Sequence, residues 1–238
     1  MPPTRSKKTS RSFAPLPPIY VFDLDETIME SGKMLQDHRN NFANMSHFDN
    51  YSIKPIVEIL RRLAVLRSHK KIHAILLLTN NQDRDYVMKV DSYLLKKLGD
   101  KFASETAKQV EHLKDLKSAF FFDNIHWLGM KQRPNNQRTQ LKKINDVKAM
   151  LDEINYNTMD LEYQEDTVSR GLSDHVVFFD DNTVHPLHQQ LSPLHAFSKF
   201  TGSNSYLTKF RKRLDDELAR TKSPKSPRSR RRNKNWRR

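Results

Sequence analysis

Short apolar runs alternate along this chain with longer segments whose apolar residues recur at helical spacing. Four of the runs predict buried β-strands, over residues 19–23, 72–78, 119–125 and 175–179. The helical spacing predicts helices over 55–68, 83–98, 140–154 and 206–218, with a weaker one over 104–117. Strands that alternate with amphipathic helices predict an α/β fold, in which helices cover both faces of a mostly parallel sheet.

The segments between these elements are mostly polar. Residues 26–50 show no clean period, and Ser31-Gly32 predicts a tight turn within them. We expect a polar loop at 132–137 and a further polar connection at 156–173. The spacing of Tyr206, Phe210, Leu214 and Leu218 predicts that the last helix uses this stripe as a packing face.

The net charge of +14 is concentrated at the two ends of the 238-residue chain. Residues 1–18 contribute +4 and residues 222–238 contribute +9, which leaves +1 for the 203 residues between them. Both ends are basic, contain no acidic residue and are too polar to build a core. We therefore expect one domain over 19–221 between two disordered tails.

Composition also excludes several classes of protein. The chain has no cysteine, which rules out disulfides, thiolate zinc sites and a cysteine nucleophile. Its longest apolar stretch, 72–78, is too short to cross a bilayer. The first residues contain no apolar run, so they do not predict a secretory signal. We expect a soluble intracellular protein that does not contact membranes.

The strongest chemical signal is Asp23-Leu24-Asp25-Glu26-Thr27, which directly follows the first strand. Alternation along an extended chain would point Asp23 and Asp25 to the same side. Two such close carboxylates repel each other, and a hard cation such as Mg²⁺ relieves the repulsion by accepting oxygen ligands from both. The alternative is an acidic turn that only caps a helix.

Two other strands also end in polar residues, namely Thr79-Asn80 and Asp180-Asp181. Because the carboxyl ends of parallel strands meet at one edge of the sheet, all three clusters are predicted to converge on one pocket. His185 and His188 are spaced like a metal pair, but with no further ligand nearby they are better interpreted as ordinary histidines. Trp127 and the Phe120–Phe122 run are predicted to lie in the core.

These motifs, in this order over residues 19–190, resemble the haloacid dehalogenase (HAD) superfamily of phosphohydrolases. The Asp-Leu-Asp-Glu-Thr form is similar to the NLI-interacting-factor-like branch, which includes phosphatases of the RNA polymerase II C-terminal domain, and to proteins of this class in large DNA viruses. The resemblance implies that Asp23 attacks phosphorus and forms an aspartyl phosphate, and that Asp25 acts as general acid and base.

The resemblance also assigns the remaining site residues. Thr79 would supply a hydroxyl to a phosphoryl oxygen, with Asn80 beside it, although a helix-capping role for Thr79 stays open. A lysine from the helix before the last motif would neutralise the phosphoryl group; Lys142 is preferred and Lys143 is the alternative. Asp180 and Asp181 would complete the Mg²⁺ site with Asp23 and Asp25, and Asp181 is favoured as the direct ligand.

The segments between the motifs are short. Residues 29–70 number 42, residues 80–141 number 62, and both contain predicted elements of the main fold. An independent cap domain needs at least about 50 residues, so we expect a HAD-like Rossmannoid fold with no large cap. Such an open site suits a phosphorylated macromolecule, most of all phosphoserine or phosphothreonine in a protein.

The basic tails bear on partners. The stretch that follows Lys222 resembles a nuclear-localisation or nucleic-acid-binding segment, which favours the nucleus over the cytoplasm. Two alternatives therefore remain beside the protein phosphatase. One is a nucleic-acid 3′-phosphatase, and the other is a non-catalytic HAD-like protein that serves nucleic-acid binding or assembly.

Overall fold

The computed structural model describes residues 17–38, 48–116, 118–128, 130–133, 136–139, 141–154, 172–191, 195–200 and 205–222. The expected tails therefore lie outside the described residues, except for Pro17, Pro18 and Lys222. Most of the polar connection at 156–173 also lies outside them.

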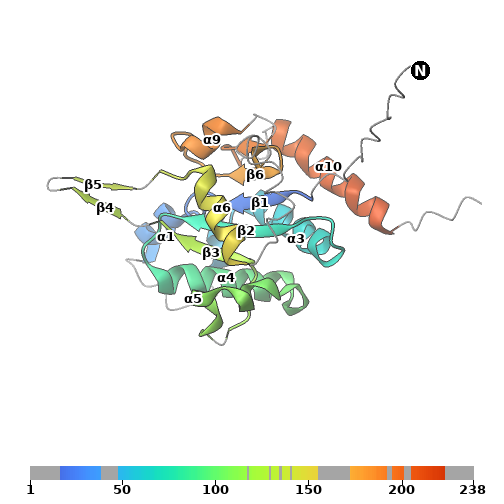
Figure 1. Cartoon of the computed structure of the whole chain (residues 1–238), viewed down its shortest axis with the longest axis horizontal. Helices are drawn as coiled ribbons and strands as arrows, with labels where there is room; N and C mark the ends of the chain where they lie inside the picture. Colours follow the sequence, from blue (N-terminus) through green and yellow to red (C-terminus); the bar gives the residue numbers. More distant parts are fainter. Residues whose placement is uncertain are drawn as a thin grey trace, which may run out of the picture.

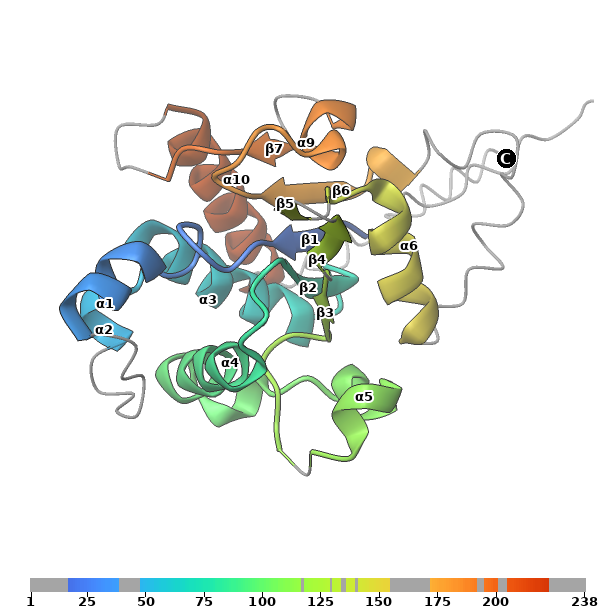
Figure 2. The ribbon, with the colours of Figure 1, turned by 90° about the vertical axis from the view of Figure 1, so that its left-hand side faces the viewer.

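Five parallel strands form the central sheet in the order β3-β2-β1-β6-β7, and the labels of these strands follow this order from bottom to top in Figure 2. The strands are β1 (Ile19–Phe22), β2 (Ala74–Thr79), β3 (Asn124–Trp127), β6 (Val176–Phe179) and β7 (Ala196–Phe197). The residues of β1, β2 and β6 are buried throughout, as expected of parallel strands covered on both faces. The predicted α/β class and parallel sheet are confirmed.

Helices pack around this sheet (Figure 1). They are α1 (Ser31–His38), α2 (Phe48–Tyr51), α3 (Lys54–Ser68), α4 (Arg84–Leu98), α5 (Glu111–Lys114), α6 (Ile144–Glu153), α9 (Pro186–Gln190) and α10 (Ser205–Lys222). Two short 3₁₀ turns, Asp100–Phe102 and Thr106–Gln109, precede α5. The single weak helix expected over 104–117 is therefore wrong, and Ser31-Gly32 begins α1 rather than a tight turn.

The third strand begins later than the apolar run predicts. The Phe120–Phe122 run is buried as expected, but β3 starts only at Asn124. The backbone N–H groups of Phe121 and Phe122 donate to the buried carboxylate of Asp91, at 3.0–3.1 Å, instead of pairing with β2. A side chain from α4 thus replaces the sheet partner of this segment.

The polar loop expected at 132–137 is instead an antiparallel hairpin. Its strands are β4 (Met130–Arg133) and β5 (Asn136–Thr139), and Figure 1 shows the hairpin projecting from the body of the molecule. Within the described residues, α1 and α2 after β1 and this hairpin before α6 are the pieces added near the carboxyl ends of the strands. None of them forms a separate domain, in agreement with a fold without a large cap.

The last helix, α10, completes the core. Phe210 packs against the rings of Phe179 and Phe197, with centroids 5.6 and 5.1 Å apart, and Leu214 is buried beside it. Tyr206, which the helical spacing placed on the packing face, is 52% exposed, and its neighbour Leu207 is buried instead. An ion pair from Arg62 to Asp215 (Nε–Oδ1 2.6 Å) joins α10 to α3. No helix in the described part of the chain is long and apolar enough to cross a membrane.

Candidate active site

The register of the sheet brings the first and last acidic motifs together. Phe22 of β1 pairs with Phe179 of β6, so Asp23 and Asp180 leave the two neighbouring strands at the same level. The Asp23 N–H continues the pairing by donating to the Phe179 carbonyl at 2.8 Å. Because the strand order reverses between β1 and β6, this point is where open parallel sheets bind ligands.

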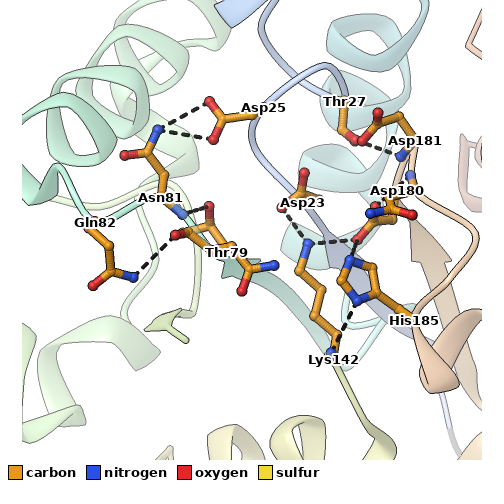
Figure 3. Close-up of polar contacts among 12 residues, drawn as sticks. Asp23, Asp25, Thr27, Thr79, Asn81, Gln82, Lys142, Asp180, Asp181 and His185 are labelled. Carbon is orange, nitrogen blue, oxygen red and sulfur yellow. Dashed lines mark hydrogen bonds and ion pairs between the residues drawn. The ribbon is translucent and has the colours of Figure 1, made fainter. Parts of the chain in front are cut away.

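Lys142 lies between these two carboxylates (Figure 3). Its Nζ donates to Asp23 Oδ1 at 2.5 Å and to Asp180 Oδ2 at 2.6 Å. The lysine and Asp180 side chains are each 1% exposed, and that of Asp23 is 9% exposed. Burial opposes the charge on Lys142, but the two carboxylates outweigh this effect and raise the pKa of its ammonium group. The predicted alternative, Lys143, is exposed and outside this cluster.

A short segment from the start of α9 holds Lys142 by its backbone. The Lys142 N–H donates to His185 Nδ1 at 3.3 Å, and the Lys142 carbonyl accepts from the Leu187 N–H at 3.0 Å. His185 is buried, and its Nε2 lies 3.6 Å from Asp180 Oδ2. Burial lowers the pKa of His185, which agrees with a neutral ring that accepts at Nδ1. This histidine is therefore part of the site's structure, a contact that its sequence position did not predict.

Asp181 completes an acidic group with Asp23 and Asp180. One oxygen from each of the three carboxylates lies within 4.8 Å of the others. The Asp181 N–H donates to Thr27 Oγ1 at 3.2 Å, and Asp180 Oδ1 accepts from the Asn182 N–H at 2.8 Å. Three carboxylates against one ammonium leave a formal charge of −2, which a divalent cation would balance. Oxygen donors of this kind suit a hard cation, so the residues present fit a metal site.

The raised pKa of Asp23 also favours a metal site at this place. Burial raises the pKa of Asp23 to about 7, against the opposing effect of Lys142 and with a smaller contribution from Asp180. Burial, followed by the Asp180 charge, also raises the pKa of Asp181. Like charges gathered in a poorly solvated place favour protonation unless a cation is present. Perturbed carboxylates of this kind are typical of functional sites.

Asp25 takes a different direction from the one that strand alternation predicts. The strand ends at Phe22, the chain bends at Leu24, and Glu26 has a left-handed backbone with φ 56°. Figure 3 shows the Asp25 carboxylate pointing away from Lys142 and toward Asn81. It lies outside the group formed by Asp23, Asp180 and Asp181. A role for Asp25 as a fourth metal ligand stays a prediction.

Thr79 and Asn80 stand at the end of β2, beside β1. Thr79 is fully buried, and its Oγ1 accepts from the Asn81 N–H at 3.0 Å, which leaves its own O–H to donate. The helix-capping role considered for Thr79 belongs instead to Asp83, whose Oδ1 accepts from the Tyr86 N–H. The side-chain Oδ1 of Asn80 is buried without a hydrogen bond among the described residues, so a role for Asn80 in binding substrate stays a prediction.

A separate cavity of about 620 Å³ opens at the other end of the sheet. Its lining includes Arg67, which reaches Asp123 at 3.0 Å and donates to the carbonyls of Phe102 and Phe121. Asp123 also accepts from the Ile75 N–H at 2.7 Å. These polar groups hold the amino ends of β2 and β3 together and are satisfied by one another, so we interpret them as structural.

The chain was compared with protein-family models, curated proteins and solved structures, and none of them matches. The structure thus supports a parallel α/β fold with an acidic group, buried at Asp23 and Asp180 and exposed at Asp181, that could hold a metal ion. Any enzymatic function proposed for this site therefore depends on its geometry and on the sequence motifs.

Proposed function

We propose that this protein is a Mg²⁺-dependent phosphomonoester hydrolase of the HAD type that works through an aspartyl-phosphate intermediate. The observation that carries the proposal is Lys142 held between Asp23 and Asp180, with Asp181 beside them, at the strand ends where the sheet order reverses. A capping turn would need neither a buried lysine nor carboxylates from two distant segments. Burying several charges together lowers the stability of the folded protein. A function that needs these charges would explain why the chain keeps them.

In the first step, an Asp23 oxygen would form a bond to phosphorus as the bond from phosphorus to the leaving oxygen breaks. Asp25 would give its proton to that oxygen. Lys142 would neutralise the phosphoryl oxygens, and the O–H of Thr79 would donate to one of them. A cation held by Asp23, Asp180 and Asp181 would supply further positive charge against the phosphoryl group.

In the second step, water would attack phosphorus and the bond to Asp23 would break. Asp25, now ionised, would take the water proton, so that phosphate leaves and both carboxyl groups return to their starting states. The lysine stays buried in both steps and keeps the site electrostatically balanced while the charge on Asp23 changes. The chain's own residues thus account for nucleophile, acid, base and charge neutralisation.

The substrate class proposed is phosphoserine or phosphothreonine in proteins, by resemblance to the NLI-interacting-factor-like branch. The described additions near the carboxyl ends of the strands, which are α1, α2 and the β4–β5 hairpin, support it, because a site without a separate cap domain suits a macromolecular substrate. A nucleic-acid 3′-phosphate is the alternative that the basic ends of the chain favour.

The experiment compares hydrolysis of an aryl phosphate by wild type and Asp23→Asn, with Mg²⁺ and with a chelator. We expect turnover by wild type only with Mg²⁺, and no turnover by Asp23→Asn. Asp174→Asn is the matched control and should turn over as wild type, because Asp174 is exposed and lies outside the acidic group. Equal rates for wild type and Asp23→Asn, or no turnover by either, would instead support a non-catalytic binding protein. A panel of phosphopeptides beside 3′-phosphorylated oligonucleotides then separates the two substrate classes.

A further inference from the structure

The Asp25 side chain is hydrogen-bonded to Asn81. Its Nδ2 donates to both carboxylate oxygens of Asp25, at 3.2 Å to Oδ1 and 3.0 Å to Oδ2. The two residues are 56 positions apart and come from the loops that follow β1 and β2 (Figure 3). Both are only partly buried, so they lie at the rim of the site rather than within the Asp23–Lys142–Asp180 cluster.

The orientation of the Asn81 amide is fixed by a second hydrogen bond. Its Oδ1 accepts from the Asp83 N–H at 2.9 Å, and a backbone N–H can only donate. The Nδ2 must therefore face Asp25. Asp83 in turn caps α4, a helix of 15 residues, through the Tyr86 N–H at 3.0 Å. Asn81 thus connects the Asp25 carboxylate to a rigid element.

The backbone of Asp25 is fixed as well, and at a cost. Glu26 adopts φ 56°, a region that non-glycine residues rarely occupy and that is unfavourable by about 1 kcal/mol. Its N–H donates to the Met29 carbonyl and its Oε1 accepts from the Gly32 N–H, both at 2.7 Å. This strained turn aims the Asp25 side chain at Asn81. Strain of this kind persists where the surrounding structure determines it and is common at functional sites.

We propose that Asn81 is a positioning residue that holds Asp25 for proton transfer to and from the substrate. This inference rests on the proposed function, in which Asp25 is the general acid and base. A general acid must place its proton within hydrogen-bond reach of the leaving oxygen, and a carboxylate free to rotate would do so only part of the time. Asn81 removes that freedom by holding both oxygens from one side.

The leaving group of the substrate distinguishes this role from a general structural one. An alkyl phosphate such as a phosphoserine peptide needs a proton on its leaving oxygen, whereas an aryl phosphate leaves readily as an anion. In Asn81→Ala we expect kcat/KM for the alkyl substrate to fall on the order of 10- to 100-fold. The kcat/KM for the aryl substrate should change by less than about threefold, since it reports phosphoryl transfer to Asp23.

Turnover of the aryl substrate supplies a second readout. Hydrolysis of the phosphoenzyme needs Asp25 as base, so kcat for the aryl phosphate should fall in Asn81→Ala. Rapid mixing should then show a burst of aryl alcohol equal to the enzyme concentration, followed by slow turnover. Gln82→Ala is the matched control, because the hydrogen bonds described for the Gln82 side chain go to the carbonyls of Asn80 and Leu128 and not to Asp25. It should behave as wild type with both substrates.

A double-mutant cycle decides whether Asn81 acts through Asp25. Adding Asn81→Ala to Asp25→Asn should cause no further loss with the alkyl substrate. Equal losses with both substrates, or losses that add in the double variant, would overturn the assignment of Asn81 while the phosphatase activity of wild type stands. Wild type without activity, or equal to Asp23→Asn, would overturn the proposed function and this inference together.

Discussion

Replacing Lys142 by methionine is the perturbation whose effect the structure defines best. Methionine keeps most of the apolar stem but removes the ammonium group that joins Asp23 to Asp180. Two nearly fully buried carboxylates would then face each other without a cation. Breaking a buried ion pair by removing one partner costs about 3–5 kcal/mol. For a domain of this size, that loss corresponds to a fall in Tm of roughly 10 °C.

The assay is urea unfolding in a chelating buffer at about pH 8, where Asp23 with its pKa of about 7 is mostly ionised. We expect the free energy of unfolding to fall by about 3–5 kcal/mol in Lys142→Met. Lys143→Met is the matched control, because it removes the same charge from an exposed neighbour. It should change stability by no more than about 0.5 kcal/mol.

Activity should separate the two lysines in the same way. Loss of an electrostatic stabiliser of the transferring group lowers kcat by about 100-fold or more, so Lys142→Met should be nearly inactive and Lys143→Met should resemble wild type. A Lys142→Met protein whose free energy of unfolding lies within about 1 kcal/mol of wild type would refute the reasoning, because removal of one partner from a buried ion pair should destabilise the protein more than that. Equal losses in the two variants would refute it as well.

Three further predictions follow from other parts of the structure. Burial raises the pKa of Asp91 to about 7, so its ionisation destabilises the folded state increasingly as the pH rises from about 4 to 7. Over that pH range, the free energy of unfolding of Asp91→Asn, measured in urea, should rise relative to that of wild type by up to about 4 kcal/mol. Asp181→Asn should weaken Mg²⁺ binding about 10-fold or more by calorimetric titration, because it removes one of three carboxylates. Phe210→Ala should lower the free energy of unfolding by about 3–5 kcal/mol, because its ring is buried against those of Tyr20, Phe179 and Phe197.

Each of these has a control and a contradicting outcome. A difference between wild type and Asp91→Asn that stays flat with pH would show that Arg67 and the backbone N–H groups of Phe121 and Phe122 keep Asp91 ionised throughout. Mg²⁺ affinity unchanged in Asp181→Asn, but reduced in the exposed variant Asp152→Asn, would remove Asp181 from the site. Tyr206→Ala, on the exposed side of α10, should cost far less than Phe210→Ala, and equal costs would contradict the observed packing.

Strand ends were the part of the site that the amino-acid pattern predicted well. Apolar runs that stop at Asp23, Thr79 and Asp180 place their polar neighbours at one sheet edge, whatever the detailed register. Because Phe22 pairs directly with Phe179 in the sheet, the clusters that begin at Asp23 and Asp180 come into contact. The parallel arrangement of the strands thus predicts the grouping of Asp23, Asp180 and Asp181, but it does not predict that Asp25 turns away from them.

Contacts between loops could not be foreseen in this way. Asn81 meets Asp25 beside Glu26, which adopts a left-handed backbone although no glycine marks that position. His185 reaches the backbone of Lys142 across 43 residues, in a loop whose path depends on tertiary packing. The late start of β3 has a similar cause, since Asp91 from α4 takes the backbone donors that a strand would have used. Local propensity carries no signal for such long-range side-chain partners.

The central claim is tested most directly by locating the phosphoryl group on the protein. Wild type is mixed with a phosphomonoester and Mg²⁺, quenched in acid within one turnover, digested and mapped by mass spectrometry. The account predicts one added phosphoryl group on the peptide that contains Asp23, absent with a chelator and absent in Asp23→Asn. Hydrolysis that proceeds with the label on another residue, or without any labelled peptide, would contradict it.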